Sequence, residues 1–139
     1  MRRVLKGFGG AWGVLLLAGC TTMARGSTVQ ARLNEPFQLP KGQVATVPSE
    51  RLTVRFTNVE SDSRCPMGVQ CIRAGEARVH FELRLPGREP EDLVLATGGA
   101  RPRYATYGAY DLHLVALEPQ RRTDVPHPAY VATLRVVRH

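Results

Sequence analysis

Strict alternation of apolar and polar residues is the feature that most constrains the fold of this chain. In residues 77–85, Val79, Phe81 and Leu83 fall on one face, and charged or histidine side chains fall on the other. A period of two residues is the spacing of a half-buried β-strand. No window shows a convincing 3.6-residue stripe of a helix, so the sequence predicts a mostly β protein.

Six more segments with β-type patterns complete the expected fold. They are residues 35–39, 43–47, 52–57, 93–97, 110–116 and 130–136. About seven short strands predict one all-β domain, an immunoglobulin-like β-sandwich, with a small barrel as the alternative. The predicted inward rows include Leu52, Val54, Phe56, Val79, Phe81, Leu83, Leu85, Leu112, Leu114, Ala116, Tyr130, Ala132, Leu134 and Val136.

Three local signals refine this expectation. The turn sequence Pro40-Lys41-Gly42 favours a hairpin between residues 35–39 and 43–47. At Asn58 the alternation loses its parity, which indicates a β-bulge or the end of the strand. Two Gly/Pro-rich stretches, residues 97–102 and 119–128, are expected to be surface loops.

The N-terminus has the organisation of a bacterial lipoprotein precursor. Residues 1–6 are basic, residues 11–18 are apolar, and the run ends in Leu17-Ala18-Gly19-Cys20, which resembles a lipobox. We therefore expect a signal peptide at 1–19, a lipidated Cys20 with a tether to residue 29, and a β-rich domain at 30–139. A secretory peptide cut near Ala18, or a buried apolar helix, is the alternative.

Charge and export limit the partners of the mature domain. The formal charge of +7 falls to +4 without Arg2, Arg3 and Lys6. The remaining basic residues are scattered, so we expect no nucleic-acid partner. The membrane, through lipid on Cys20, and an envelope protein or glycan are the expected partners, at the outer membrane facing the periplasm if the organism has two membranes.

Cys65 and Cys71 remain once Cys20 is assigned to lipid. In an oxidising compartment this pair predicts a disulfide that closes a short loop.

The segment around these cysteines, residues 61–77, carries the most specific pattern. Its Asp-Ser-Arg-Cys-Pro run, its second cysteine and its Ala-Gly turn resemble the signature of a family of small, uncharacterised bacterial secreted proteins and lipoproteins. The matching residues are Asp62, Ser63, Arg64, Cys65, Pro66, Cys71, Ala74, Gly75 and Ala77. The resemblance implies an exported β-rich domain of unknown activity. Arg73 departs from the pattern, because tryptophan is commoner there.

Two interpretations of this segment follow from its residue types. It can be a cross-linked corner between two strands, in which Arg64 pairs with Asp62 or Glu76. It can also be a rigid recognition loop, because binding residues often lie on loops that a scaffold holds. The candidate recognition residues are Asp62, Arg64, Met67, Gln70 and Arg73.

Chemistry elsewhere in the chain gives weaker hypotheses. Asp111 and His113 share a strand face and, with His80, could serve an envelope hydrolase, although no nucleophile motif accompanies them. The set Cys65, Met67, Cys71 and His80 could bind a soft metal, but oxidised cysteines are the commoner outcome in exported proteins.

Aromatic and basic side chains also gather in residues 101–110. Tyr104, Tyr107 and Tyr110, with Arg101 and Arg103, either contact a glycan or protein partner or form a core strand and its covered edge. The sequence as a whole predicts a non-enzymatic binding or structural lipoprotein without a cofactor or metal. A hydrolase inhibitor is one specific form of this prediction.

Overall fold

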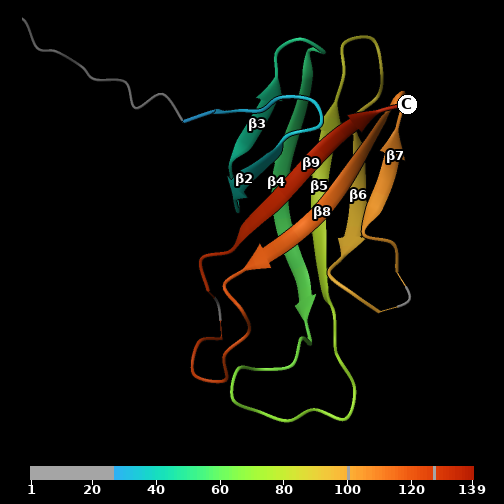
Figure 1. The fold of residues 1–139 in the computed structure, drawn as a ribbon. Helices are drawn as coiled ribbons and strands as arrows, with labels where there is room; N and C mark the ends of the chain where they lie inside the picture. Colours follow the sequence, from blue (N-terminus) through green and yellow to red (C-terminus); the bar gives the residue numbers. More distant parts are fainter. Residues whose placement is uncertain (1–26, 100, 127) are drawn as a thin grey trace, which may run out of the picture.

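The computed structural model describes residues 27–99, 101–126 and 128–139, which form two stacked β-sheets (Figure 1). The strands are β1 (Val29–Gln30), β2 (Pro36–Pro40), β3 (Val44–Val47), β4 (Leu52–Asp62), β5 (Ala77–Arg84), β6 (Glu91–Ala96), β7 (Tyr104–Tyr107), β8 (Tyr110–Glu118) and β9 (Val131–Arg138). The predicted signal peptide and Cys20 lie outside the described residues. Within those residues, no helix is long and apolar enough to cross a membrane.

The two sheets stack as a sandwich. One has the strand order β1-β3-β4-β5-β6 and the other β2-β9-β8-β7, and they do not close into a barrel. Neighbouring strands are antiparallel except for β1, which runs parallel to β3. The all-β sandwich prediction is confirmed. The seven predicted strands correspond to β2–β6, β8 and β9, and β1 and β7 are additional.

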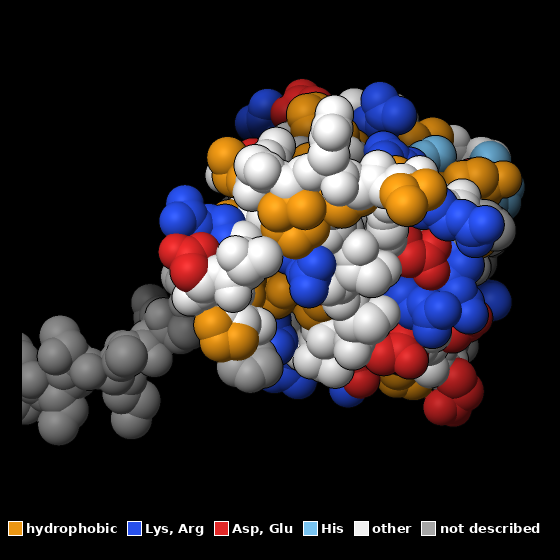
Figure 2. All heavy atoms as spheres, turned by 90° about the horizontal axis from the view of Figure 1, so that it is seen from below, with side chains coloured by type: hydrophobic (Ala, Val, Ile, Leu, Met, Phe, Trp, Pro, Cys, Tyr) orange, Lys and Arg blue, Asp and Glu red, His pale blue; other side chains and the backbone are white. Residues whose placement is uncertain are grey.

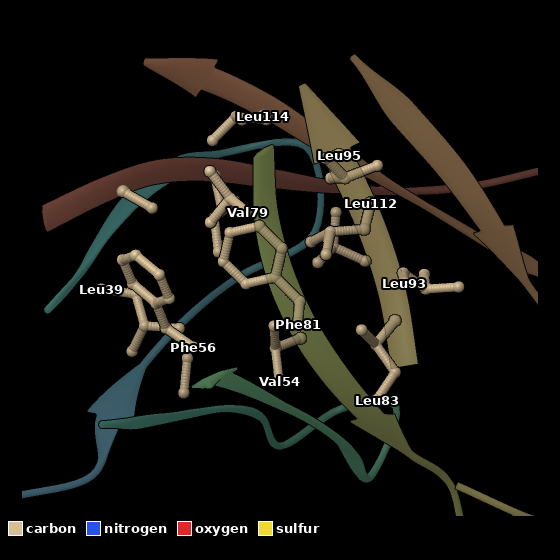
Figure 3. Close-up of a cluster of buried hydrophobic side chains, with 14 of the residues drawn as sticks. Leu39, Val54, Phe56, Val79, Phe81, Leu83, Leu93, Leu95, Leu112 and Leu114 are labelled. Carbon is tan, nitrogen blue, oxygen red and sulfur yellow. The ribbon is translucent and has the colours of Figure 1, made fainter. Parts of the chain in front are cut away.

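The space between the sheets is filled by the apolar rows that alternation predicts. Figure 3 shows side chains from both sheets pointing toward one another around Phe56 and Phe81, whose ring centroids lie 5.2 Å apart. Most predicted inward residues are buried. Tyr130, Leu85 and Ala116 are only half-buried.

The predicted hairpin around Pro40-Lys41-Gly42 is wrong. β2 pairs with β9 and β3 pairs with β4, so this turn carries the chain from one sheet to the other. Phe37 and Leu39 on β2 and Val47 on β3 are all buried in the core, which they reach from opposite sides. Periodicity identifies an inward face but does not tell which sheet a strand joins.

The parity break at Asn58 is a bulge, and the alternative of a strand end there is wrong. β4 continues to Asp62 through register shifts at Phe56/Asn58 and Val59/Ser61. The long strand brings Asp62 to the end of the sandwich that carries residues 63–76 and 119–130. We call this the loop end. In Figure 1 it lies at the bottom, away from β1 and the C-terminus.

A second bulge changes which residues of β8 face the core. A register shift between Leu114 and Ala116 makes Val115 an extra residue in the strand. The predicted inward position Ala116 is therefore half-buried, and Leu117 is buried in its place. Tyr107 on the additional strand β7 is also buried, with 1% exposure, so it belongs to the core.

Candidate functional site

The loop between β4 and β5 is closed by a disulfide. The sulfurs of Cys65 and Cys71 lie 2.16 Å apart, and the two Cα atoms lie 5.9 Å apart. This pairing confirms the predicted bond. Because the sulfurs are bonded to each other, they are not free thiolate ligands for a metal.

A close contact between two chain segments forms the neck of this loop. The main-chain N–H and hydroxyl of Ser63 both donate to the carbonyl oxygen of Glu76, at 2.9 Å each. The Glu76 N–H donates back to the Ser63 hydroxyl at 3.1 Å. A Cβ atom on Gly75 would lie 1.6 Å from the Ser63 carbonyl oxygen. The neck therefore requires glycine at position 75, which gives the Ala-Gly turn a structural reason.

Arg64 fastens the loop to the other sheet. Its guanidinium donates to both carboxylate oxygens of Asp62, at 2.8 and 2.7 Å. It also donates to the carbonyl oxygens of Leu117 at 2.6 Å and Pro119 at 2.9 Å. Leu117 lies on β8, whereas Asp62 ends β4, so one side chain links the two sheets. We call these contacts the arginine latch.

The carboxylate of Asp62 completes the latch. Its side chain is 10% exposed, and it also accepts a hydrogen bond from the Tyr130 hydroxyl at 3.0 Å. Burial opposes ionisation, but the Arg64 guanidinium and the Tyr130 hydroxyl more than offset it, so the pKa of Asp62 is below its usual value. Burial and the neighbouring Asp62 carboxylate both raise the pKa of Tyr130.

Arg121 joins the disulfide loop to the loop that follows β8. The main-chain N–H of Met67 donates to the Arg121 carbonyl oxygen at 3.0 Å. The Arg121 guanidinium donates to the Arg64 carbonyl oxygen at 3.2 Å. The disulfide loop is therefore held by its neck, by the latch and by this second loop.

The outer side chains of the disulfide loop face solvent. Met67 is 59% exposed, Val69 is 50% exposed and Ile72 is fully exposed. Gln70 and Arg73 are exposed beside them. We call these five residues the loop tip. Figure 2 looks at this end of the molecule and shows hydrophobic side chains as separate islands on a largely polar surface.

The predicted recognition residues thus separate into two groups. Asp62 and Arg64 are largely buried in the latch, with 10% and 15% exposed side chains. Met67, Gln70 and Arg73 lie on the loop tip. Sequence reasoning missed Val69 and Ile72; the available signal was two apolar residues in a Gly/Pro-containing loop outside any alternating pattern.

The other candidate residues have contacts of their own. Asp111 accepts a bond from Thr106 at 2.6 Å and lies 3.7 Å from His139, while His113 stacks on Tyr104 with centroids 5.2 Å apart. No hydrogen bond joins Asp111 to His113 in the described part of the chain. The residues described also contain no group of three or more His, Cys, Asp or Glu placed to hold a metal.

A further cluster lies on the outer face of the first sheet. His80 Nδ1 is 2.7 Å from an Asp92 oxygen, and Nε2 is 3.4 Å from a Glu60 oxygen. The bond to Asp92 raises the pKa of His80, partial burial lowers it, and the bond to Glu60 raises it, with a net increase. This arrangement is an ion-paired surface group on β4, β5 and β6.

Comparison with family models, curated proteins and solved structures found no match for this chain. The resemblance of residues 61–77 to a lipoprotein signature remains a prediction from sequence.

Proposed function

We propose that this protein is a lipid-anchored binding module of the cell envelope that presents the loop tip to a protein partner. One observation carries the proposal. The frame of the disulfide loop is fixed by internal bonds, while Met67, Val69 and Ile72 expose apolar side chains to solvent. These side chains cover no core, so a role in recognition accounts for their position better than a role in stability.

A fixed loop has an energetic advantage in binding. Ordering a flexible loop on association costs free energy, about 0.5–1.5 kcal/mol for each immobilised rotamer-rich side chain. The disulfide and the arginine latch order this frame before a partner arrives. Apolar side chains at the centre of an interface, with a polar rim such as Gln70 and Arg73 supply, match the usual anatomy of protein interfaces.

The proposed anchor would place the loop tip away from the membrane. β1, which follows the predicted lipidation site, pairs with β3 beside Thr53 and Val54 at the start of β4. The disulfide loop follows the other end of β4, which is about 30 Å away at roughly 3.3 Å per strand residue. Figure 1 shows β1 and the disulfide loop at opposite ends of the sandwich.

An inhibitor of a hydrolase is the specific form we favour. A rigid, protruding, disulfide-closed loop has the shape that enters an enzyme cleft. This form predicts inhibition of the captured partner by the full-length protein and weaker inhibition by Ile72→Asp, because a charge there would have to be buried without a partner.

Site-specific photo-crosslinking tests the proposal in cells that produce the full-length chain. A photoreactive residue at Ile72 should give one discrete adduct with another protein. The matched control places the same residue at the exposed Arg135 on β9, away from the loop end. Equal adduct patterns from the two positions would contradict a role for the loop tip.

The anchor needs its own measurement. Mass spectrometry of the detergent-extracted protein should find diacylglyceryl on Cys20 and no residues 1–19, and Cys20→Ser should abolish acylation. A free amino terminus at another residue would contradict the proposed anchor without affecting the crosslinking result.

A further inference from the structure

A groove between β8 and the disulfide loop lies beside the loop tip but does not include it. It has a volume of about 480 Å³, and Val115 and Ala116 of β8 line it together with Ala74 and Gly75 of the loop. Three arginines, Arg64, Arg103 and Arg121, also line it. This volume is within the range of small-molecule sites, roughly 300–1,000 Å³.

The charge of this groove is not balanced by its own residues. Its lining includes no aspartate or glutamate. Arg64 is neutralised by Asp62 in the latch. The carboxylate of Glu76, which follows the lining residue Gly75, pairs with Arg78 at 3.2 Å and lies 3.9 Å from Arg101. Two cationic groups of the groove, Arg103 and Arg121, therefore remain without a carboxylate in its lining.

Neither of these two arginines pairs with a carboxylate within 4.0 Å in the described ranges. Each donates one bond to a main-chain carbonyl, Arg103 to Thr97 and Arg121 to Arg64. A guanidinium has five N–H groups in a fixed fork, so both side chains keep donors for a ligand. The neighbouring groove at Tyr130, of about 500 Å³, shares Arg121 with this one but differs because Glu60 and Asp62 line it.

We propose that the groove between β8 and the disulfide loop binds a carboxylate carried on a small, partly apolar ligand, with Arg103 and Arg121 as its charge partners. The planar guanidinium fork matches the geometry of a carboxylate, and charge-assisted bonds of this kind are roughly twice as strong as neutral ones. Val115, which is 45% exposed, and Ala116 give the β8 side of the groove an apolar surface that suits a hydrocarbon group next to the carboxylate. The Gln120 side chain also lines the groove and adds an amide group.

The same chemistry can come from the C-terminus of a peptide or from an acidic sugar. The probes N-acetyl-leucine and glucuronate separate these sources, and N-acetyl-leucine amide and glucose are their uncharged counterparts. Heteronuclear NMR titration of the full-length chain in a neutral detergent reports both affinity and location. We expect at least one acid to bind at least tenfold more tightly than its neutral counterpart, with shifts centred on Ala74, Gly75 and Leu114–Leu117.

Three variants test the residues. Arg103→Gln should weaken binding of the acid about tenfold, whereas Arg121→Lys, which keeps the charge, should weaken it less. Arg135→Gln removes the same charge from the exposed face of β9 and should leave affinity unchanged. Higher salt should weaken binding, because partly exposed charges are screened.

Several results would overturn the proposal. One is equal affinity for each acid and its neutral counterpart, and another is an equal loss of affinity in Arg103→Gln and Arg135→Gln. A third is chemical-shift changes centred outside the groove. The last is no saturable binding of either acid up to about 10 mM, a concentration well above a millimolar Kd. Because the loop tip does not line the groove, none of these results bears on the crosslinking at Ile72.

Discussion

The middle of the sandwich and its loop end are stabilised by different kinds of interaction. In the middle, rows such as Phe56, Phe81 and Leu112 are fully buried, and their contacts are apolar. At the loop end, Arg64 donates to the Asp62 carboxylate and to main-chain carbonyl oxygens, Ser63 donates to another carbonyl oxygen, and a disulfide closes the chain. The free energy from apolar burial depends on the buried area, so another apolar side chain of similar size can replace the original. The polar contacts instead require particular donor and acceptor atoms at particular positions.

The loop end also contains a natural control for its own latch. Arg122 binds both oxygens of Asp124, at 3.0 and 2.8 Å, with the same two-residue separation as Arg64 and Asp62. The side chains of this second pair are 54% and 62% exposed. Two pairs with the same chemistry thus differ in burial and in their links to main-chain carbonyls, so comparing them measures the combined effect of these two differences.

Truncation of a core ring should have the largest effect. Phe81→Ala removes a fully buried ring that packs against Phe56, and should cost about 3–5 kcal/mol in the free energy of unfolding. Arg84→Ala on the outer face of the same strand should have a far smaller effect on the free energy of unfolding, because the Arg84 side chain is exposed. Chemical denaturation of both variants checks the assignment of faces; equally mild effects would contradict it.

Removal of the latch should come next. Arg64→Leu leaves Asp62 without its ionic partner and removes the arginine donors from two carbonyls, and should cost about 1.5–3 kcal/mol, the range for hydrogen bonds to charged groups. Arg122→Leu should lower the free energy of unfolding much less, because its ion pair is exposed to solvent. Similar losses for the two arginines would show that the latch does not hold the loop end.

The stabilisation that the latch provides should depend on pH. Because the pKa of Asp62 is lowered in the fold, its contribution is present at neutral pH and is lost as the pH falls below about 4. In Arg64→Leu that contribution is already missing. The difference in unfolding free energy between wild type and variant should therefore narrow from pH 7 to pH 3, and a constant difference would contradict the role assigned to Asp62.

Loss of the disulfide should have a smaller effect. The bond joins residues only six apart, so the stabilisation that it provides by reducing the entropy of the unfolded chain is about 2 kcal/mol. The double change Cys65→Ser and Cys71→Ser should leave the protein folded, with Tm lower by roughly 8 °C for a domain of this size. Calorimetry of the full-length chain checks this, and an unfolded variant would mean that the bond supports the whole fold.

The apolar framework could be predicted from sequence because each strand carries its own period. Residues 77–85 alternate without interruption and form β5 with every predicted face correct within the strand. The wrong predictions concern features that tertiary contacts determine, such as which sheet a strand joins. Gly42 permits a turn with φ of 86°, but only the facing apolar rows show that this turn joins two sheets.

The site was harder to predict for the same reason. The sequence indicates that Arg64 can pair with Asp62, which lies two residues away, and the structure has this pair. The bonds from Arg64 to Leu117 and Pro119 span more than fifty residues, and no local pattern encodes them. Short-range rules therefore identified the loop but not which of its side chains are internal.

The smallest expected effect on stability comes from His80 on the outer face of the first sheet. Unlike the buried latch, it is an ion-paired group at the surface. His80 bonds Asp92 on β6 and Glu60 on β4, with Arg78 4.0 Å from the same Glu60 side chain. Because the pKa of His80 is raised in the fold, its contribution is complete below about pH 6.5 and is lost as the pH rises through the folded-state value. Exposed pairs of this kind contribute about 0.2–1 kcal/mol. The Tm advantage of wild type over His80→Gln should therefore be present at pH 6 and disappear by about pH 9, the opposite direction to the acid-side loss at Asp62. An advantage that grew with pH would mean that neutral His80 is the form the fold prefers.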